Sequence, residues 1–334
     1  MPNTLPYSSK SQVPKVSVIM AVYNCAPYLK ESIDSIIDQT LSDFEFIIVD
    51  DASTDETPQI LAEYAAKDPR IRVLCNEQNL KLPASLNIAI GLARASLIAR
   101  MDGDDWAHPR RLELQYAYLN AHPQIDICGT AIECFGEKSG KVCWPEDHEV
   151  LAVYLLFFNA MAHPTVMGRK EAFMHGYDAT YHKAQDYELW SRLAFEHGCR
   201  FGNLQEVLLK YRVDAKPGFE PFHCKVSLKN ILRLGLKPSE KQVAMHEKLC
   251  LGGLDAVRVE YSAQEIIDWC FLIYQANLLC MSVNSTRLFR FFVPWLVTTL
   301  PSLSFSGYSV FNFRRIFYCL RESFMLALGY FHGI

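Results

Sequence analysis

Short apolar runs alternate with amphipathic segments along the first third of the chain. Four of these runs are rich in β-branched and other apolar residues, as is typical of buried parallel strands. They lie at 16–22, 44–49, 71–74 and 97–99. In each intervening segment the apolar residues recur every three or four positions, which predicts a helix. This alternation predicts an α/β fold in which a doubly wound, mostly parallel sheet is flanked by helices.

Local signals place the starts of these helices. Pro27 and Pro109 can occupy the first turn of a helix, where a backbone N–H is not needed. Ser53 and Glu56 have the spacing of a capping box, which predicts a helix start between the second and third strands.

The pattern is less regular after Pro123. Strands are predicted at 125–129, 141–144 and 207–212, and helical segments at 150–158 and 184–193. A Pro-Gly pair at 217–218 then precedes a stretch in which helical spacing dominates. We therefore expect a polar N-terminal tail at 1–14, one α/β domain at 15–218 and a mainly helical C-terminal region at 219–334.

Polar residues directly follow three of the predicted strands. They are Tyr23-Asn24 after the first strand, Asp50-Asp51 after the second, and the stretch 102–105 after the fourth. Ligands of doubly wound sheets bind beyond the carboxyl ends of the strands, so these residues mark the expected site. No GxGxxG sequence follows the first strand, and no GxxxxGK[ST] sequence occurs in the chain. Dinucleotide-binding and P-loop sites are therefore disfavoured.

Three carboxylates crowd the end of the fourth predicted strand, at Asp102, Asp104 and Asp105. Like charges this close repel one another, and desolvation increases the cost. Hard divalent cations such as Mg²⁺ and Mn²⁺ prefer oxygen ligands and are commonly shared with substrate phosphates. One interpretation is therefore a metal site against a phosphorylated substrate. The other is an acidic turn, because Asp-Gly is common in turns and Asp caps helices.

Composition narrows the class of protein. The chain has 334 residues, of which 50% are hydrophobic and 21% charged, enough for a sizeable core. Its net charge of −4 does not favour nucleic acid as a partner. The 11 cysteines form no CxxC pair, which indicates a reducing compartment in which they act as small buried hydrophobes. Residues 1–15 lack an apolar core, so we expect no signal peptide and a cytoplasmic protein.

Five motifs in a fixed order resemble the GT-A nucleotide-sugar glycosyltransferases, specifically the inverting family 2 of bacterial surface-glycan synthesis. The resemblance covers roughly 15–214 and rests on VIMAVYN at 18–24, IVDDASTD at 48–55, MDGDD at 101–105, QDYELW at 185–190 and YR at 211–212. It implies a GT-A fold, a nucleotide-diphosphate-sugar donor and a Mn²⁺ or Mg²⁺ ion. It also implies a single displacement that inverts the anomeric configuration.

The resemblance assigns donor-binding roles to residues at the strand ends. It implies that Ala21 and Tyr23 pack at the nucleotide and that Asp51 accepts a hydrogen bond from the edge of the nucleobase. A carboxylate is a suitable acceptor for an imide N–H, which fits uracil and favours a UDP-sugar. Asp102 and Asp104 belong to the donor-binding element of the family, with Asp104 on the ribose side.

Metal binding and catalysis fall to further carboxylates. The resemblance implies that Asp105, together with Asp104, holds the metal on the donor diphosphate. Asp186 matches the catalytic base, which would take the proton of the acceptor hydroxyl. Many relatives carry a histidine two residues after the Tyr-Arg pair. Here that position is Asp214, which is either a further metal ligand or a solvent-exposed residue.

Two other functions remain open at this level. A sugar-nucleotide nucleotidyltransferase also uses acidic residues on a related sheet, but it would normally carry a glycine-rich, basic loop after the first strand. A degenerate, non-catalytic sugar-nucleotide-binding module would not be expected to retain Asp51, Asp104, Asp105 and Asp186 together. The acceptor that the resemblance implies is a glycan or lipid-linked sugar in polysaccharide or lipopolysaccharide synthesis.

Several conspicuous side chains have ordinary structural explanations. Trp190 is more typical of a core residue than of a sugar platform, and Asp50 is expected to pair with nearby backbone N–H groups. For Arg110 and Arg111 a solvated first helical turn is favoured over contact with phosphates. His163 is either part of an acceptor-side loop or a packed histidine.

The C-terminal region is basic and aromatic. From Ser285 onward it carries a net charge of +4, which leaves −8 on the rest of the chain. Residues 291–313 carry no charge, a length that could span a bilayer, but Pro294, Pro301 and Gly307 interrupt the segment. We therefore favour a peripheral anchor on the anionic inner face of the cytoplasmic membrane. The alternative is a helical cap that packs on the catalytic domain or forms the interface of a homo-oligomer.

Overall fold

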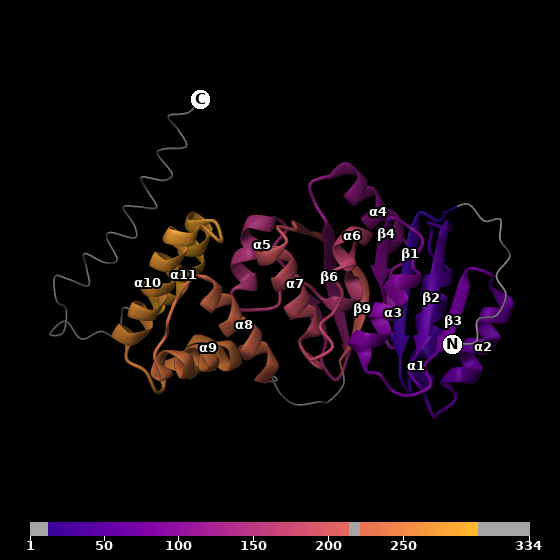
Figure 1. The fold of residues 1–334 in the computed structure, drawn as a ribbon, viewed down its shortest axis with the longest axis horizontal. Coiled ribbons are helices and arrows are strands. Elements are labelled where there is room, and N and C mark those ends of the chain that lie inside the picture. The colour runs from indigo at the N-terminus through magenta and orange to yellow at the C-terminus, as the bar shows by residue number, and fades with distance from the viewer. Residues whose placement is uncertain (1–12, 214–220, 300–334) are drawn as a thin grey trace. The chain divides into compact units, whose positions relative to one another are not determined.

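The structure is a computed structural model that describes residues 13–213 and 221–299 (Figure 1). The chain divides into two compact units. The first comprises the residues up to 148 together with 159–218, and the second comprises 149–158 and the chain from 219 onward. The sequence predicted one uninterrupted α/β domain, whereas here the apolar segment 149–158 belongs to the second unit.

A parallel arrangement opens the first unit, as predicted. Strand β1 (Val16–Val22) lies between β2 (Phe44–Asp50) and β4 (Leu97–Arg100), and β3 (Ile71–Cys75) borders β2. All three pairings are parallel. Every residue of β2 and β4 is buried, as are all but one of β1. This near-continuous burial is typical of a parallel sheet covered by helices on both faces.

Strands of both directions extend the sheet beyond β4. Strand β8 (Met167–Arg169) pairs antiparallel with β4 and with β6 (Ile127–Gly136), and β6 pairs in parallel with β9 (Phe201–Val213). The short strands β5 (Trp106–Ala107) and β7 (Gly140–Val142) add antiparallel pairs to β9 and β6. The path of the sheet is β3-β2-β1-β4-β8-β6-β9-β5. The sheet as a whole is therefore mixed, and the parallel order predicted from the sequence applies to its first four strands.

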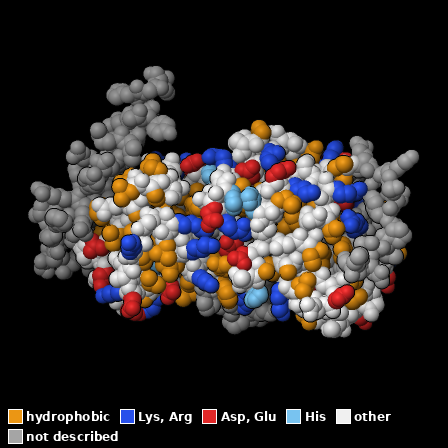
Figure 2. Space-filling view, viewed as in Figure 1, with side chains coloured by type: hydrophobic (Ala, Val, Ile, Leu, Met, Phe, Trp, Pro, Cys, Tyr) orange, Lys and Arg blue, Asp and Glu red, His pale blue; other side chains and the backbone are white. Residues whose placement is uncertain are grey.

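Helices connect the strands, and their apolar faces supply much of the core. Leu29, Ile33 and Ile36 of the first helix, for example, are fully buried. On the face drawn in Figure 2, acidic and basic side chains are interspersed with hydrophobic ones. The helices of this unit are α1 (Ala26–Ile37), α2 (Thr57–Lys67), α3 (Leu82–Leu92), α4 (Arg111–Ala121), α6 (Lys170–Phe173) and α7 (Gln185–Glu196), with the 3-10 turn η1 (His163–Thr165).

Two predicted helix starts differ from the structure. Helix α4 begins at Arg111, two residues after Pro109. The capping box expected at Ser53 and Glu56 is wrong, because Glu56 is itself the N-cap residue of α2 and makes no side-chain capping bond. Instead, Ser53 Oγ accepts a hydrogen bond of 2.9 Å from the backbone N–H of Asn24. The serine therefore joins the loops that follow β1 and β2.

The second unit is helical, as predicted for the C-terminal region. It contains most of α5 (His148–Leu155) and the helices α8 (Pro221–Arg233), α9 (Glu240–Arg258), α10 (Ala263–Cys280) and α11 (Ser285–Thr299). Helices α9 and α10 each begin with a complete capping box. Among the residues that the structure describes, no helix combines the length and apolar character needed to cross a membrane.

The beginning of the uncharged segment 291–313 packs inside this second unit. Phe291 stacks on Phe157 with 5.0 Å between the ring centroids and contacts Tyr154 edge-on at 5.5 Å. Phe292 is only 2% exposed. The described start of the segment therefore contributes to a helical core, and 300–313 lie outside the described residues.

A buried carboxylate ties together the starting ends of the parallel strands. Glu45 of β2 is 3% exposed and accepts a hydrogen bond of 2.6 Å from Ser17 Oγ of β1. It also accepts bonds of 2.7 Å from both the backbone N–H and the Nε of Arg94, just before β4. This end of the sheet lies opposite the strand ends that carry the polar residues.

We expect Glu45→Ala to lower the free energy of unfolding by about 3 kcal/mol, because removing one partner of a buried, hydrogen-bonded ion pair leaves the others unsatisfied. Urea denaturation followed by circular dichroism measures this loss. Glu113→Ala is the control, since Glu113 pairs with Arg110 at the surface and its removal should change stability little. Equal losses in the two variants would contradict the role assigned to Glu45.

Candidate active site

The strand ends of the parallel half-sheet meet where the sequence placed its polar residues. Val22 of β1 lies in register with Asp50 of β2, and β4 pairs with the other side of β1. Asp50 Oδ1 accepts a bond of 3.1 Å from the backbone N–H of Ser53, which confirms its predicted structural role. The turn 101–105 that follows β4 therefore emerges beside the loops after β1 and β2.

The acidic turn packs closely against the loop after β1. A Cβ atom at Gly103 would lie 2.7 Å from Val22 Cγ1 and 2.9 Å from Cys25 Sγ, distances that side chains do not tolerate. Ser32 Oγ of α1 donates a hydrogen bond of 2.6 Å to the backbone carbonyl of Asp102. Glycine is required between the carboxylates because of this close approach.

The three carboxylates of this turn converge. One oxygen from each of Asp102, Asp104 and Asp105 lies within 4.8 Å of the others. Asp105 is buried, and its Oδ1 accepts a bond of 2.8 Å from the backbone N–H of Arg212. Its Oδ2 is buried and has no hydrogen-bond partner among the described residues. Buried oxygens are normally satisfied, so an orphaned carboxylate oxygen beside two further acids fits a hard divalent cation.

A buried arginine balances part of this negative charge. The guanidinium of Arg100, which is 1% exposed, forms two hydrogen bonds with the Asp102 carboxylate, one of them 2.6 Å from Nη1 to Oδ2. Burial lowers the pKa of Arg100, but the charge and hydrogen bond of Asp102, with the charges of Tyr177 and Asp105, together outweigh it and the pKa is raised overall. Arg100 therefore stays charged beneath the acidic turn.

Arg111 donates a hydrogen bond to the main chain of Arg100. The prediction that Arg111 lies in a solvated helical turn is wrong. Its side chain is fully buried, and Nη2 donates a bond of 2.5 Å to the backbone carbonyl of Arg100 while Nε donates to Gln115 at 3.1 Å. Burial, with the neighbouring charge of Arg100, lowers the pKa of Arg111 to about 10. Arg110, in contrast, is exposed and pairs with Glu113. The two arginines differ because Arg111 lies on the buried face of α4, whereas Arg110 is the N-cap residue before the helix.

Arg212 of β9 contacts the acidic turn through two hydrogen bonds. Besides the backbone bond to Asp105, Arg212 Nε donates a hydrogen bond of 3.0 Å to the backbone carbonyl of Asp104. The Arg212 guanidinium lies 3.9 Å from the ring centroid of Tyr28 and 4.5 Å from that of Phe135. Arg212 thus fixes both the main chain and the charge environment of the turn.

Asp51 organises the loop that precedes α3. Its Oδ1 accepts bonds of 2.7 Å from Asn76 Nδ2 and 2.8 Å from the backbone N–H of Leu80, and its Oδ2 accepts one of 2.9 Å from the backbone N–H of Lys81. A carboxylate offers about four acceptor positions. Three of these positions accept hydrogen bonds from the protein, so one is left for a further donor.

Ala21 and Tyr23 lie at the carboxyl end of β1. Ala21 is half-buried within the strand, and Tyr23 is 51% exposed just beyond it. An exposed aromatic ring beside a strand end is accessible to a ligand bound at this edge of the sheet.

Asp186 lies in the first turn of α7, where Asn159 Nδ2 donates a bond of 2.7 Å to its Oδ2. Tyr177 is a further buried residue of this region, and its hydroxyl lies 2.8 Å from Nε2 of His163. Burial raises the pKa of Tyr177, the charge of Arg100 lowers it, and the charges of Asp186 and Asp102 raise it further.

Three residues of this site were not identified from the sequence. Arg100 could have been noticed, because an arginine inside an apolar strand, directly before three acids, needs a partner. Tyr177 and Asn159 carry no comparable signal, because their contacts with His163 and Asp186 arise through tertiary packing alone.

Other predicted residues have clear outcomes. Trp190 is fully buried, as predicted for a core residue. His163 is a packed histidine, 8% exposed, with its Nε2 2.8 Å from the hydroxyl of Tyr177. Asp214 lies outside the described residues. The prediction that the cysteines are buried is wrong for three of them, which are exposed free thiols: Cys75, Cys143 and Cys280.

We expect Asp105→Asn to stabilise the protein in the presence of a chelator, and to do so more at pH 8 than at pH 5. Burial and the charge of Asp102 raise the pKa of Asp105 to about 8, so its ionised form is disfavoured in the folded state. Wild-type stability therefore falls as the pH rises from about 4 towards about 8, whereas asparagine stays neutral and retains the acceptor for Arg212. The gain at pH 8 should be roughly 1 kcal/mol or more.

Calorimetry at both pH values, with chelator and with added Mn²⁺, tests this expectation. Mn²⁺ should raise the melting temperature of the wild type but not that of Asp105→Asn. Asp43→Asn, at an exposed position, is the matched control and should show neither effect. A variant no more stable than the wild type at pH 8, or one still stabilised by Mn²⁺, would contradict the assignment.

Solved structures share this fold. The S. aureus protein TarS (residues 1–349, in complex with UDP-GlcNAc) gives a TM-score of 0.56 at 18% identity, over 83% of this chain and 86% of that chain. The mannosyltransferase PcManGT from Pyrobaculum calidifontis, in complex with GDP-Man and Mn²⁺, gives 0.50 at 18% identity, over 97% and 90%. The fold is therefore the GT-A fold of glycosyltransferases, as the resemblance implied.

Sequence comparison then gives the family. The model of glycosyl transferase family 2 matches residues 17–211, more than half of the chain. The Bacillus subtilis protein EpsE is 42% identical over 211 residues, which cover 60% of this chain and 74% of EpsE. The O-antigen biosynthesis glycosyltransferase WbnJ of Escherichia coli is 38% identical over 208 residues, which cover 60% of this chain and 80% of WbnJ. The chain belongs to glycosyl transferase family 2 and is a glycosyltransferase.

Proposed function

We propose that this enzyme is an inverting, metal-dependent glycosyltransferase of cell-surface polysaccharide or lipopolysaccharide synthesis. It moves a sugar from a nucleotide-diphosphate-sugar donor, preferably a UDP-sugar, to a hydroxyl of a glycan or lipid-linked acceptor. The observation that carries this proposal is the buried, unpartnered Oδ2 of Asp105 within the acidic cluster. That oxygen makes chemical sense as the ligand of a cation shared with a donor diphosphate.

Donor binding falls to the loops at the carboxyl ends of β1 and β2. Asp51 has one acceptor position left after its three bonds to the protein, and a nucleobase N–H would occupy it. The backbone N–H of Asp51 donates a bond of 2.8 Å to the carbonyl of Val22, so the flanking residues Ala21 and Tyr23 lie near Asp51 and would pack against the nucleotide. Asp102 is neutralised by Arg100, so it orders the turn, and we assign Asp104 to the ribose side.

Asp104 and Asp105 would hold Mn²⁺ or Mg²⁺ against the donor. When bound, the ion supplies positive charge that stabilises the departing nucleotide diphosphate. Arg212 keeps both aspartates in place through its bonds to the Asp105 carboxylate and the Asp104 carbonyl.

Asp186 is the general base in this proposal. Asn159 engages its Oδ2, and we assign Oδ1 to the acceptor hydroxyl. Asp186 takes the hydroxyl proton as that oxygen forms its bond to the anomeric carbon. The bond from the anomeric carbon to the diphosphate oxygen breaks in the same displacement, so the configuration inverts.

The relatives support the substrate class. TarS and PcManGT are described with UDP-GlcNAc and with GDP-Man and Mn²⁺, and WbnJ is named for O-antigen biosynthesis. Family membership disfavours the nucleotidyltransferase alternative. The presence of Asp186 together with the three carboxylates of the acidic turn disfavours a non-catalytic binding module.

We expect Asp186→Asn to bind donor as the wild type does but to lose transfer by about 10²-fold or more, because the acceptor proton has no base. Calorimetric titration with UDP, GDP and dTDP in the presence of Mn²⁺ measures binding, and release of nucleotide from the matching sugar donors measures transfer. Asp178→Asn, an aspartate eight positions earlier that bonds to Thr180, is the control. Near-normal transfer by Asp186→Asn would place the base elsewhere.

We also propose contact with an anionic membrane through the basic residues of the C-terminal region. The start of the uncharged segment is packed within the second unit, so the attraction is assigned to charge rather than to insertion of that part. The double variant Arg314→Gln/Arg315→Gln should bind vesicles containing phosphatidylglycerol about 30-fold more weakly, since each basic residue near such a surface contributes about 1 kcal/mol and tenfold corresponds to about 1.4 kcal/mol.

Sedimentation with vesicles measures this, with neutral phosphatidylcholine vesicles and Lys30→Gln as controls. Lys30 is an exposed cation of the first unit. If the double variant bound as tightly as the wild type, or if binding were equal on neutral vesicles, the electrostatic attachment would be refuted.

A further inference from the structure

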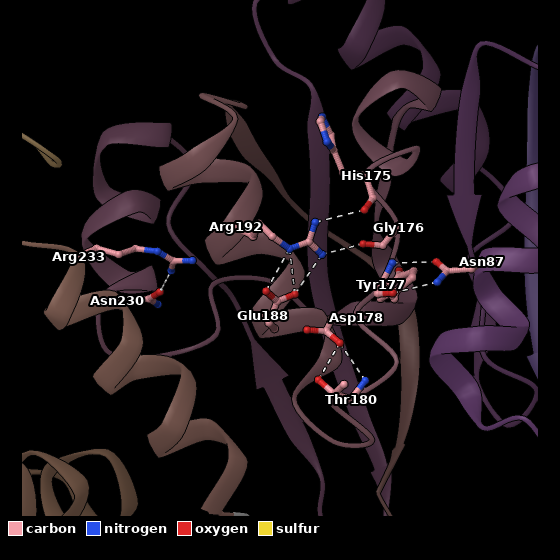
Figure 3. Close-up of polar contacts among 10 residues, drawn as sticks. All are labelled: Asn87, His175, Gly176, Tyr177, Asp178, Thr180, Glu188, Arg192, Asn230 and Arg233. Carbon is pink, nitrogen blue, oxygen red and sulfur yellow. Dashed lines mark hydrogen bonds and ion pairs between the residues drawn. The ribbon is translucent and has the colours of Figure 1, made fainter.

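A short segment between α6 and α7 has no role in the chemistry proposed above, yet the protein holds its main chain from two sides (Figure 3). From one side, the side chain of Asn87 in α3 brackets Tyr177. Asn87 Oδ1 accepts a bond of 2.8 Å from the Tyr177 backbone N–H, and Asn87 Nδ2 donates one of 2.9 Å to the Tyr177 carbonyl. One amide thus satisfies both backbone groups of a single residue.

From the other side, Arg192 of α7 binds the two preceding carbonyls. Its Nη2 donates a bond of 2.7 Å to Gly176 O, and its Nη1 donates one of 3.2 Å to His175 O. Glu188, which is 2% exposed, fixes the guanidinium through contacts of 3.1 to 3.3 Å. Figure 3 shows Asn87 and Arg192 approaching the segment from opposite directions.

Gly176 makes this double attachment feasible. Its φ of +67° lies in the left-handed region, and a Cβ there would come within 3.3 Å of Asn87 Oδ1. A side chain at this position would be strained by the backbone conformation and crowded by the clamping amide. The chain therefore turns sharply just before Tyr177 and directs that residue into the protein.

The two clamping helices are the ones that carry the opposite halves of the site. Helix α3 begins directly after Lys81, whose backbone N–H is bound by Asp51. Helix α7 carries Asp186 in its first turn. The segment around Tyr177 therefore links the helix behind the donor loop to the helix that presents the base.

The side chain of Tyr177 is 4% exposed, and its hydroxyl lies 2.8 Å from Nε2 of His163, which is also buried. The turn that contains His163 is bonded to β4, because Val166 donates its backbone N–H to the His163 carbonyl at 3.4 Å and accepts a bond of 2.9 Å from the backbone N–H of Arg100. His163 in turn packs edge-on against Trp190 of α7, with 6.1 Å between the ring centroids.

We propose that Tyr177 is a positioning residue that fixes Asp186 relative to the Arg100–Asp102 pair through its hydrogen bond to His163. It touches neither donor nor acceptor. The hydrogen bond holds the rings of Tyr177 and His163 in one arrangement, and His163 packs on Trp190 of the helix that carries Asp186. This inference rests on the proposed function, because it assigns Tyr177 to the geometry of the proposed base.

Tyr177→Phe tests the proposal, because it removes only the hydroxyl and keeps the ring. We expect kcat for transfer to fall about tenfold, since sub-ångström misplacement of a base is costly in rate. The affinity for UDP and Mn²⁺ and the KM for donor should stay within about twofold, because the acidic turn keeps its own contacts. Tyr64→Phe, which loses a hydroxyl bond to Asp34 far from the site, is the matched control and should retain wild-type kcat.

A second measurement separates positioning from a general structural role. His163→Phe should lower kcat by a similar factor, and the double variant Tyr177→Phe/His163→Phe should be no slower than either single variant, because both act through one bond. Should Tyr177→Phe fail to fold, His163→Phe alone is measured against the same expectations.

Three results would overturn the proposal: an unchanged kcat in Tyr177→Phe, a fall in kcat matched by an equal loss of UDP affinity, or additive effects in the double variant. The failure of the proposed function looks different. In that case the wild type itself would show no nucleotide release from any donor with acceptor present. If the wild type transfers and Tyr177→Phe equals it, only the role of Tyr177 falls.

Discussion

The site depends on the cost of burying negative charge at the end of β4. Asp105 is buried, Asp102 lies beside it, and one oxygen of Asp105 has no protein partner among the described residues. Arg100 offsets part of this charge and is itself supported by Arg111. The fold tolerates this arrangement because Arg100 and Arg111 supply positive charge and the backbone N–H of Arg212 donates a hydrogen bond to Asp105. The remaining deficit of positive charge is what makes the turn a receptor for a cation.

The mixed half of the sheet contributes to the same arrangement. Strand β9 runs past the turn and delivers Arg212 to Asp104 and Asp105. The antiparallel pair between β5 and β9 fixes that crossing. The first half of the sheet thus supplies the acidic turn, and the second half supplies Arg212, which holds that turn in place.

The parallel half of the sheet was easier to predict from the sequence than the mixed half. The first four strands and their helices were predicted because each is a local, periodic pattern bounded by polar residues. The capping box at Ser53 was wrong because the same side chain served a tertiary contact with Asn24. The solvated position expected for Arg111 was wrong because a charged residue on the inner face of a helix looks, in sequence, like one on its outer face. The strands after Pro123 pair with partners far along the chain, such as β6 with β9, and a local pattern of apolar residues does not indicate such a partner.

The sequence by itself determined the parallel half-sheet, the three acids at the end of β4 and the motifs that resemble family 2. These are local features, set by the period of apolar residues and by short spacings between polar ones. Only the tertiary structure decided that Asp105 has an orphaned oxygen, that Arg100 and Arg111 are buried, and that Asn159 reaches Asp186. Burial and pairing depend on residues that lie far apart in the chain, and no local pattern encodes which of them will meet.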